Sequence, residues 1–540
     1  MTGVLVNSVL YSDRGSWTSI GRYIFDCFEK NSASDCCVWL ENGERRSISY
    51  GQMLEAVKRV GSYLFTAVGK GGHVALLGKK SLEWIVSYFG CLCYGVVVSP
   101  LDAALSREES AKQFRFSDST LLLYDPACAG IAEHIKELCP DTHCVPLRAG
   151  DGSFSAASLI GGDFPVSEAP ELKEDDLAEI LFTSGTTGVG KGVMLSVGNV
   201  CAAVMFGIRL VDCASDESLL SILPNNHSFE LAVGLLTPIY FGMSIILCSS
   251  VKTIKDCFRT FRPSIMLVVP SLMQLFRKEI LREAKRRGEA EKLEQGLRIA
   301  RELKPVGVDA QRSAAREILS YFGGRLKCLI CGGAFFSEDL VSFYDDIGIR
   351  FIEGYGITEC APIVSCNTDR FSCHLGVISP YCEVRIEDGE ICVSGKNVML
   401  GYYKNPEQTA LALKDGWFHT GDLGALDEQG CLILHGRKDN LIINSNGENI
   451  SPEQVENYLS TKEIIAQSVV YAEDDLLAAS IYPNLRFAEA NGIRDVEQAV
   501  REAVEETNKT LPHKLRVERI HIRKEPFEMT STMKVKRGKR

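Results

Sequence analysis

The sequence lacks several features that would restrict its class of function. Its 540 residues carry 59 Lys and Arg against 70 Asp and Glu, a net charge of −11, so the basic excess typical of a nucleic-acid binder is missing. A composition of 45% hydrophobic and 24% charged residues is typical of globular proteins. We therefore expect neither a disordered nor a fibrous chain, and no nucleic-acid partner.

Segments that would export the chain or anchor it in a membrane are also missing. Residues 1–11 contain no Lys or Arg followed by an apolar run, so we expect no secretory signal and a cytoplasmic location. The longest apolar stretches, 85–101 and 231–248, are interrupted by Gly and Pro. We expect each to be a buried helix that runs into a buried strand, not a membrane span of about 20 residues.

Cysteine is plentiful, with 20 residues, but its spacing predicts no metal site. The one Cys-x-x-Cys pair, Cys328 and Cys331, would be half of a zinc site, and no second pair or nearby His pair completes it. The apolar residues between the two cysteines indicate a buried strand. We expect the cysteines to be small packing residues in a reduced protein.

The hydrophobic pattern predicts an α/β fold in two domains. Residues 37–50 alternate around Glu41-Asn42-Gly43, which predicts a hairpin, and strands then alternate with amphipathic helices to about residue 350. Short strands and tight turns after residue 385 predict a β-rich subdomain. We expect an N-terminal body of stacked α/β sheets over 1–438 and a small mobile α+β domain over 439–540.

A charged segment interrupts the α/β pattern at 277–327. It contains 14 Lys and Arg against 8 Asp and Glu, a balance of +6, so the rest of the chain carries −17. We expect two or more surface helices there. In the small domain, Ser451-Pro452-Glu453-Gln454 predicts a capping box at the start of a helix.

A decapeptide rich in Gly, Ser and Thr follows the apolar strand 180–182. Its glycines allow backbone N–H groups to turn inward, and its hydroxyls and one lysine add donors, so it predicts a polyphosphate cradle. Its spacing also fits the P-loop of nucleotide triphosphatases, but Gly192 stands where that loop needs Ser or Thr, and 193–196 reads as extended. A P-loop ATPase remains an alternative. The residues are Thr183-Ser184-Gly185-Thr186-Thr187-Gly188-Val189-Gly190-Lys191-Gly192.

Seven further motifs follow the cradle in order. They are Pro224-Asn225-Asn226-His227-Ser228-Phe229-Glu230, Cys331-Gly332-Gly333-Ala334, Glu353-Gly354-Tyr355-Gly356-Ile357-Thr358-Glu359, Trp417-Phe418-His419-Thr420-Gly421-Asp422, Gly436-Arg437-Lys438-Asp439, Asn446-Gly447-Glu448-Asn449-Ile450 and Thr530-Ser531-Thr532-Met533-Lys534. Through this series, which spans roughly 40–537, the chain resembles the adenylate-forming (AMP-binding) acyl-CoA synthetases, in particular bacterial long-chain fatty acid–CoA ligases. The charged segment also resembles an element of the long-chain branch.

The resemblance implies a reaction in two halves. A fatty acid carboxylate, of medium or long chain, attacks the α-phosphate of ATP to give acyl-AMP and pyrophosphate, and a thiol then takes the acyl group. The thiol would be that of CoA, or the phosphopantetheine of an acyl carrier protein. The protein would mainly position the reactants and neutralise phosphoryl charge.

The resemblance also implies roles for single residues. Lys534 would bridge carboxylate and nucleotide, Glu359 would hold Mg²⁺, and Lys191 and Thr358 would contact phosphate. Tyr355 would stack on adenine, while Asp422 and Arg437 would bind the ribose. The other implied cofactor-binding positions are Thr183, Ser184, Gly185, Thr186, Thr187, Gly188, Gly333, Ala334, Gly354, Gly356 and Gly447.

The acyl pocket and the domain hinge are implied in the same way. His227, Phe229 and Gly332 would line the pocket, with a gating or lining role for the histidine. The apolar residues 231–236 suit an alkyl chain and disfavour a substrate ammonium group. Asp439 would be the hinge, and Gly447 would approach the pantetheine arm after rotation.

Three alternatives stay open at this point. The chain could load a carrier protein instead of CoA, bind nucleotide without catalysis, or hydrolyse ATP to ADP as a P-loop enzyme. A separate hypothesis places the basic segment on anionic lipid at the inner face of the membrane, at about 1 kcal/mol per basic residue near the surface. Its test residues are Arg282, Lys285, Arg286 and Arg287.

Overall fold

A computed structural model gives the fold. It describes residues 5–6, 14–150, 152–183, 190–332, 338–367, 375–443, 449–474, 476–529 and 535. The predictions that lie outside these residues concern Ser184, Gly185, Thr186, Thr187, Gly188, Gly333, Ala334, Gly447 and Lys534.

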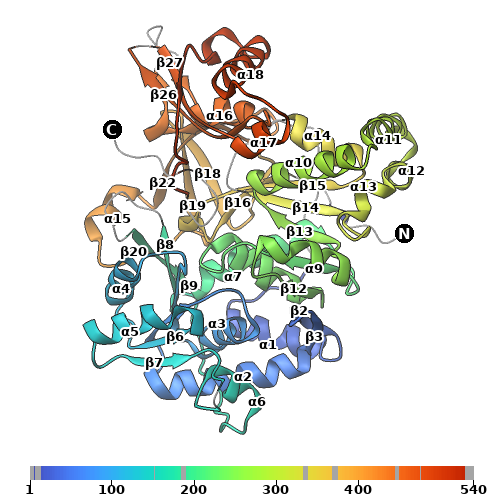
Figure 1. Cartoon of the computed structure of the whole chain (residues 1–540). Coiled ribbons are helices and arrows are strands. Elements are labelled where there is room, and N and C mark those ends of the chain that lie inside the picture. Colours follow the sequence, from blue (N-terminus) through green and yellow to red (C-terminus); the bar gives the residue numbers. More distant parts are fainter. Residues whose placement is uncertain are drawn as a thin grey trace.

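A seven-stranded sheet forms one half of the body (Figure 1). Its inner strands are parallel, and two antiparallel strands extend one edge, so the sheet is of the largely parallel type that the sequence predicts. In sheet order the strands are β20 (Gly401–Tyr402), β9 (Lys191–Ser196), β8 (Leu177–Thr183), β5 (Val97–Leu101), β4 (His73–Leu77), β6 (Leu121–Tyr124) and β7 (His143–Pro146).

A nine-stranded sheet forms the other half. It is parallel from β15 to β2 and antiparallel at both ends. Asn42 and Gly43 have φ of 50° and 82°, which confirms the predicted hairpin with a primed turn. In sheet order the strands are β17 (Val377–Ile378), β16 (Ile363–Asn367), β15 (Arg350–Gly356), β14 (Cys328–Gly332), β13 (Ile265–Val268), β11 (Ser218–Ser221), β12 (Ser244–Leu247), β2 (Asp35–Glu41) and β3 (Glu44–Ser49).

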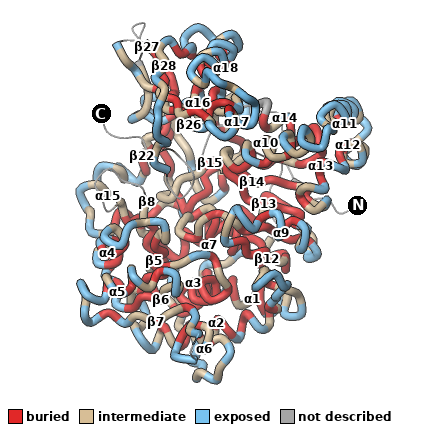
Figure 2. The backbone as a smooth tube through the Cα atoms, in the orientation of Figure 1, coloured by how far each residue is buried: buried red, intermediate tan, exposed pale blue. Residues whose placement is uncertain are grey.

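Apolar helices fill the interior of the body. Every residue of α3 (Leu82–Tyr94) is buried, as Figure 2 shows, and it leads into β5, as predicted for 85–101. The stretch 231–248 likewise forms the buried π-helix η2 (Glu230–Leu236), α8 (Thr237–Tyr240) and β12. The other helices of the body are α1 (Ile20–Lys30), α2 (Tyr50–Val68), α4 (Arg107–Phe116), α5 (Ala129–Leu138), α6 (Ala156–Gly161), α7 (Val197–Leu210), α9 (Ile254–Phe261) and α14 (Glu338–Asp346).

No helix among the described residues combines the length and apolar character needed to cross a bilayer. Cys328 and Cys331 are buried on β14, where the Cys331 thiol donates to the carbonyl of Val268 at 2.8 Å. The prediction that this pair lies on a buried strand is confirmed.

A β-rich subdomain follows the nine-stranded sheet, as the turn spacing predicts. Asp388-Gly389 and Asp415-Gly416 have positive φ and join antiparallel neighbours. Its elements are β18 (Cys382–Glu387), β19 (Glu390–Gly395), α15 (Pro406–Ala412), β21 (Leu413–Lys414), β22 (Trp417–Leu426) and β23 (Leu432–Arg437).

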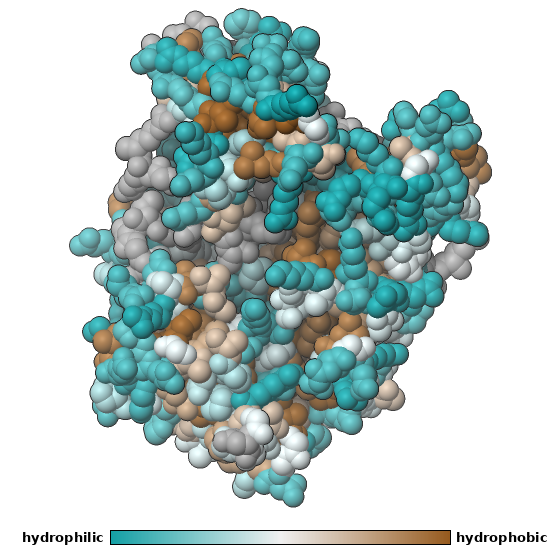
Figure 3. Space-filling model, in the orientation of Figure 1, coloured by the Kyte–Doolittle hydropathy of each residue, from teal (hydrophilic) through white to brown (hydrophobic). Residues whose placement is uncertain are grey.

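The charged segment is helical, and hydrophilic side chains cover most of it on the face in Figure 3. Its basic side chains have partners: Arg282 pairs with Glu279, while Arg286 and Arg287 share Glu283. These ion pairs lie within the segment, so they neutralise charge locally and leave its net charge at +6. The helices are α10 (Pro270–Arg286), α11 (Ala290–Glu302), α12 (Val308–Ala314) and α13 (Arg316–Ser320).

The C-terminal part has its own hydrophobic cluster, which includes Ile450, Val455, Val500 and Val517. The α16 helix begins after Ser451 as predicted, but the capping box is wrong: the Ser451 hydroxyl donates to Glu453 at 3.0 Å and caps no backbone N–H. The elements are β24 (Ile442–Ile443), β25 (Asn449–Ile450), α16 (Pro452–Ser460), β26 (Ile465–Glu473), β27 (Leu476–Pro483), α17 (Leu485–Ala490), α18 (Val496–Thr510) and β28 (Arg519–Ile522).

Candidate active site

The predicted site residues lie at strand ends of both sheets of the body. Thr183 ends β8 of the seven-stranded sheet, while Gly332 and Gly356 end β14 and β15 of the nine-stranded sheet. The two sheets meet here, because Tyr402 of the first donates a hydrogen bond to Glu359, which follows β15 of the second. Ligands of open α/β sheets bind outside the carboxyl ends of strands, so this junction is the candidate active site.

The phosphate loop joins two antiparallel strands rather than a strand and a helix. It starts at Thr183, the last residue of β8, and ends at Lys191, the first residue of β9. The hydroxyl of Thr183 lies 3.5 Å from the carbonyl oxygen of Lys191. A P-loop needs a helix directly after the lysine, so the structure disfavours the P-loop ATPase and confirms the extended conformation expected for 193–196.

Tyr402 joins the loop lysine to the predicted metal ligand. The Lys191 ammonium lies 4.7 Å from the centre of the Tyr402 ring, within cation–π range. The Tyr402 hydroxyl donates to Oε1 of Glu359 at 2.9 Å. Tyr402 was not among the site residues predicted from the sequence. Its place directly after Gly401 on an edge strand is a weak signal for a site residue.

Glu359 fits a magnesium ligand. It lies in the short 3₁₀-helix η5 (Thr358–Cys360), and its backbone carbonyl accepts from Met399 N at 2.9 Å. Its Oε2 makes no hydrogen bond with the described residues. A carboxylate oxygen is the kind of ligand that Mg²⁺ prefers.

A hydrogen-bonded network holds the predicted ribose carboxylate. The Tyr355 hydroxyl donates to Oδ2 of Asp422 at 2.8 Å, and Arg437 Nε donates to Oδ1 at 2.9 Å. Tyr355 is 7% exposed and Asp422 is 5% exposed. Burial, reinforced by the Asp422 carboxylate, raises the pKa of Tyr355 well above its usual range, so its hydroxyl remains a donor.

Two glycines of the Gly-Tyr-Gly motif have opposite surroundings. A Cβ atom on Gly356 would lie 1.8 Å from the carbonyl oxygen of Pro362, so no side chain fits there. A Cβ atom on Gly354 would meet nothing closer than 3.8 Å. Gly356 thus serves the close approach of two backbones, whereas a methyl group on Gly354 would make ordinary van der Waals contacts.

The predicted pocket residues Phe229 and Gly332 lie together. A Cβ atom on Gly332 would stand 3.7 Å from the Phe229 ring and 3.3 Å from the carbonyl of Gly354. His227 is half-buried one turn before η2. The pocket lining therefore reaches the same strand ends as the nucleotide residues.

A charged pair lies behind the pocket segment. Glu230 is completely buried and binds Lys80 Nζ and the Ser221 hydroxyl. Burial lowers the pKa of Lys80, although Glu230 opposes this shift. Glu230 is thus paired inside the protein, and the sequence analysis missed Lys80 because the two residues are 150 positions apart.

Two further carboxyl groups near the site are protonated more easily than usual. Burial raises the pKa of Glu353, which precedes Gly354 on β15, to about 7. Burial also raises the pKa of Glu179 on β8 to about 7, and the Tyr88 hydroxyl donates to it at 3.0 Å. Neither residue was predicted, because no motif distinguishes a buried carboxyl from an exposed one.

The link to the C-terminal part is short. Asp439, the predicted hinge, lies in the 3₁₀-turn η6 (Lys438–Asn440) between β23 and β24. Lys438 Nζ binds Glu390 at 3.2 Å, whereas Asn440 Nδ2 donates to Glu453 at 2.7 Å. The residue before Asp439 therefore contacts the β-rich subdomain, and the residue after it contacts the C-terminal part.

The helix α10 also reaches across to the C-terminal part. Gln274 Nε2 donates to the Ser460 hydroxyl at 2.6 Å, and Lys278 Nζ lies 3.4 Å from the Ser460 carbonyl. Lys285 Nζ donates to Asn491 at 3.1 Å. The insert is thus an interdomain contact, and one of its four proposed lipid-binding residues is engaged there.

Comparison with models of protein families identifies the family of this chain. The model of the AMP-binding enzyme family matches residues 27–403, and the model of the AMP-binding enzyme C-terminal domain matches residues 439–540. The chain belongs to the AMP-binding enzyme family. The resemblance drawn from the ordered motifs is thereby confirmed.

Several curated relatives of this AMP-binding enzyme are acid–CoA ligases by name. A feruloyl-CoA synthase from Amycolatopsis sp is 31% identical over 76% of this chain and 78% of its own length. Human long-chain-fatty-acid–CoA ligase 1 is 28% identical, covering 81% and 70% respectively. Long-chain-fatty-acid–CoA ligase FadD15 of Mycobacterium bovis is 26% identical, covering 87% and 86%.

Solved structures confirm the α/β fold with a large body and a small C-terminal domain. The anthranilate CoA ligase AuaEII, in complex with anthranoyl-AMP, superposes with a TM-score of 0.78 at 18% identity, covering 97% of this chain and 96% of that one. The A-PCP didomain of carboxylic acid reductase from Segniliparus rugosus, in complex with AMP, gives a TM-score of 0.81 at 18% identity, covering 98% and 82%.

Proposed function

We propose that this AMP-binding enzyme activates a medium- or long-chain fatty acid. The acid carboxylate attacks the α-phosphate of ATP, giving acyl-AMP and pyrophosphate, and the acyl group then passes to the thiol of CoA with release of AMP. The observation that carries this proposal is the Tyr355–Asp422–Arg437 network at the strand ends beside Lys191 and Glu359.

The network suits the recognition of a nucleoside. Tyr355 and Arg437 each occupy one lone pair of the Asp422 carboxylate, which leaves further lone pairs to accept from two ribose hydroxyls. As the resemblance implies, the Tyr355 ring would stack on the adenine base. The hydroxyls of Thr183 and Thr358 and the Lys191 ammonium are the donors for the phosphates.

Glu359 would hold Mg²⁺, which would neutralise phosphate charge during transfer. Tyr402 orients the Glu359 carboxylate by donating to Oε1, so the other oxygen faces the ligand side. Lys191, above the Tyr402 ring, adds positive charge at the same end of the site. These residues position and stabilise the phosphates; they transfer no proton in the first half-reaction.

The acyl substrate is assigned from the pocket and the relatives. Phe229 and Gly332 lie at its mouth with His227, and residues 231–236 behind them are entirely apolar. No charged group of this segment is left for a substrate ammonium, since Glu230 is paired with Lys80. Relatives named for long-chain fatty acids support an alkyl substrate, whereas the feruloyl-CoA synthase makes an aromatic acid the competing assignment.

The second half-reaction needs the small domain, proposed as 439–540, to move about Asp439. Lys534 would serve adenylation, and Gly447 would approach the pantetheine arm after rotation. An acyl carrier protein could replace CoA as acceptor, because both present the same phosphopantetheine thiol. A scaffold that binds nucleotide without catalysis is the alternative of a different class.

We place the enzyme in the cytoplasm and favour a solvated pair of helices for the insert, with peripheral contact at the inner face of the membrane as the competing hypothesis. The ion pairs of Arg282, Arg286 and Arg287 with acidic neighbours weaken this contact, because they reduce the charge offered to anionic lipid. Neutralising these arginines together with Lys285 should abolish co-sedimentation with anionic vesicles. If this variant co-sediments with the vesicles as the wild type does, membrane contact through the insert is wrong.

One experiment tests the function and the substrate together. Straight-chain acids from acetate to palmitate, with ferulate for comparison, are assayed for pyrophosphate release with CoA, with a phosphopantetheinylated carrier protein and without a thiol. We expect the highest rates for the longer alkyl acids and acyl-CoA as the product. Acid-independent ATP turnover, or no turnover with any acid, would contradict the proposal.

A further inference from the structure

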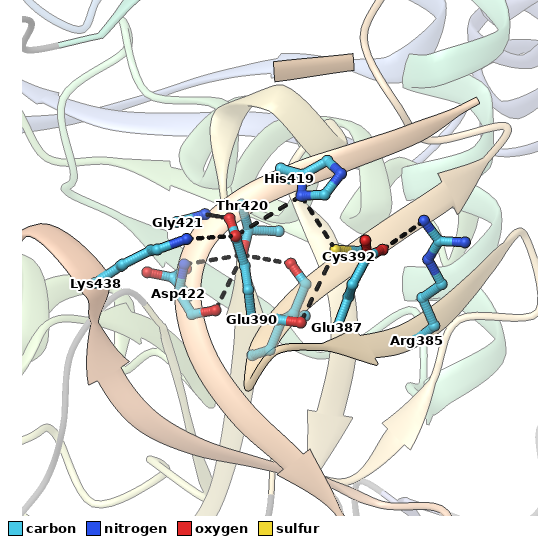
Figure 4. Close-up of polar contacts among 10 residues, drawn as sticks. Arg385, Glu387, Glu390, Cys392, His419, Thr420, Gly421, Asp422 and Lys438 are labelled. Atoms are coloured by element: carbon cyan, nitrogen blue, oxygen red, sulfur yellow. Dashed lines mark hydrogen bonds and ion pairs between the residues drawn. The ribbon is translucent and has the colours of Figure 1, made fainter. Parts of the chain in front are cut away.

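Three metal-ligating side chains meet in the β-rich subdomain, outside the site described above. They are Glu387 at the end of β18, Cys392 on β19 and His419 on β22 (Figure 4). One ligand atom of each, a carboxylate oxygen, the thiol sulfur and a ring nitrogen, lies within 4.8 Å of the other two. We propose that these three residues bind a divalent transition metal of the zinc class, meaning Zn²⁺ or Co²⁺.

The strand register, not a loop, brings the three ligands together. Cys392 is the ladder partner of Arg385 on one side and of His419 on the other. Side chains of directly opposed residues lie about 4.5–5.5 Å apart at Cβ on the same face of a sheet. Glu387 follows Arg385 by two residues and therefore points to that face. Three neighbouring strands thus hold the ligands on regular structure.

The distance between sulfur and nitrogen fits coordination. Cys392 Sγ and His419 Nδ1 are 3.5 Å apart. With Zn–S near 2.3 Å and Zn–N near 2.0–2.1 Å, tetrahedral angles place these two atoms about 3.5 Å apart. This spacing is that of an ordinary hydrogen bond to sulfur, and it also matches one edge of a zinc tetrahedron. A mixed S, N and O donor set is also one that zinc and cobalt prefer over Mg²⁺ or Ca²⁺.

The surroundings leave a route for the ion and a fourth position. Cys392 is completely buried, the His419 side chain is 17% exposed and the Glu387 side chain is 49% exposed, so an ion would enter from the Glu387 side. Arg385 binds Oε2 of Glu387 at 2.6 Å and can keep that oxygen while Oε1 binds the metal. Glu390 Oε2 lies 3.7 Å from His419 Nδ1 but is not part of the group whose ligand atoms lie within 4.8 Å of one another, so Glu390 would have to move closer to supply the fourth ligand; otherwise water supplies it.

A metal ion bound to these three residues would affect the active site and the hinge. Glu390 also binds Lys438, the residue before Asp439, and accepts from the backbone N–H of Gly421. If the metal recruited the Glu390 carboxylate as a ligand, it would compete with the Lys438 ammonium for that carboxylate. Asp422 follows His419 by three residues on the same strand. We therefore expect the metal to slow acyl-CoA formation; this consequence rests on the proposed function, but the binding itself does not.

The test uses the full chain, treated with a chelator and titrated with Co²⁺. Cobalt bound to a thiolate gives a charge-transfer absorption band that cobalt bound only to oxygen and nitrogen lacks. The variants are Cys392→Ser and the exposed Glu387→Gln. The matched control is Cys382→Ser, because Cys382 lies on the neighbouring strand β18, hydrogen-bonds the carbonyl oxygens of Val364 and Ser379, and is not part of the three-residue group. Unfolding midpoints without metal verify that each variant folds.

We expect one Co²⁺ per chain with the charge-transfer band in the wild type and the control, and displacement of cobalt by Zn²⁺. Cys392→Ser should lose the band, and Glu387→Gln should weaken binding at least about tenfold, as loss of metal-site partners generally does. A band that persists in Cys392→Ser, disappears in Cys382→Ser or is missing in the wild type would overturn the proposal. If Zn²⁺ binds as expected but leaves acyl-CoA formation unchanged, only the coupling to the hinge is overturned.

Discussion

The nucleotide end of the site and the contact between body and C-terminal domain are built in opposite ways. At the nucleotide end, Tyr355 and Asp422 are almost completely buried and hydrogen-bonded to each other. At the interdomain contact, polar side chains of α10 reach Ser460 and Asn491, while the hydrophobic clusters of the two parts share no residue among those described. The first arrangement forms once, on folding; for the second, we propose that it is broken and re-formed in each reaction cycle.

The largest effect should come from removing the shared carboxylate. Asp422→Ala leaves Arg437 and the Tyr355 hydroxyl without their buried partner, which typically costs 2–5 kcal/mol. We expect acid-dependent pyrophosphate release to fall roughly 30- to 4,000-fold. Glu428→Ala, at an exposed turn of the same subdomain, is the matched control. A rate within tenfold of the wild type would show that the nucleotide end is not held by this network.

The buried carboxyl of Glu179 predicts a pH dependence of stability. Its pKa is about 7 in the folded protein, against an ordinary value of 4.5, so the folded state binds the proton more tightly than the unfolded state. This contribution is complete below pH 4.5 and is lost as the pH rises through 7, a loss of about 3 kcal/mol in the free energy of unfolding.

Glu179→Gln mimics the protonated carboxyl and should remove that part of the pH dependence. Denaturant unfolding of the two proteins from pH 5 to 8 measures the difference. Stability curves that stay parallel across this range would contradict the assigned pKa.

The two glycines on either side of Tyr355 should differ in how far an added methyl group destabilises the protein. Gly356→Ala must displace the Pro362 carbonyl, and such overpacking typically destabilises by 1–3 kcal/mol. Gly354→Ala should leave the free energy of unfolding within about 0.5 kcal/mol, because its methyl group would lie 3.8 Å or more from its neighbours. Thermal unfolding of both variants measures the difference. Equal destabilisation by both variants would be inconsistent with this geometry.

The smallest effect should come from the interdomain contact. Gln274→Ala with Lys278→Ala removes two polar contacts to Ser460, each worth about 0.5–1.5 kcal/mol. We expect the rates of the two half-reactions, measured separately, to change by less than about tenfold each and in opposite directions. Arg282→Ala on the same helix, which pairs only with Glu279, is the control. Identical changes in both half-reactions would argue against a contact that is broken during the cycle.

The sequence predicted what depends on local pattern and on ordered motifs. The hairpin at Asn42-Gly43 and the buried helices follow from periodicity, whereas Thr183, Gly332 and Gly354 were named through the family resemblance. Pairings between distant segments could not be predicted. The Tyr402–Glu359 and Lys80–Glu230 contacts, and the meeting of Cys392 with His419, depend on strand register and three-dimensional packing that no single stretch of sequence determines.

The cysteines illustrate the same limit. Cys328 and Cys331 have the spacing of a metal motif, yet they lie on a buried strand. Cys392 has no such spacing, and only the ladder places it beside His419 and Glu387. The expectation that all cysteines serve packing alone is therefore replaced, at this one position, by the proposed metal site.

Product analysis of the first half-reaction without a thiol tests most directly whether the enzyme forms an acyl-AMP intermediate. Full-length enzyme is mixed with ATP, Mg²⁺ and a long-chain acid, quenched, and analysed by mass spectrometry before and after addition of CoA. We predict acyl-AMP and pyrophosphate in equal amounts, and then acyl-CoA and AMP once CoA is added. ADP and phosphate, or acyl-CoA without a preceding acyl-AMP, would contradict this prediction.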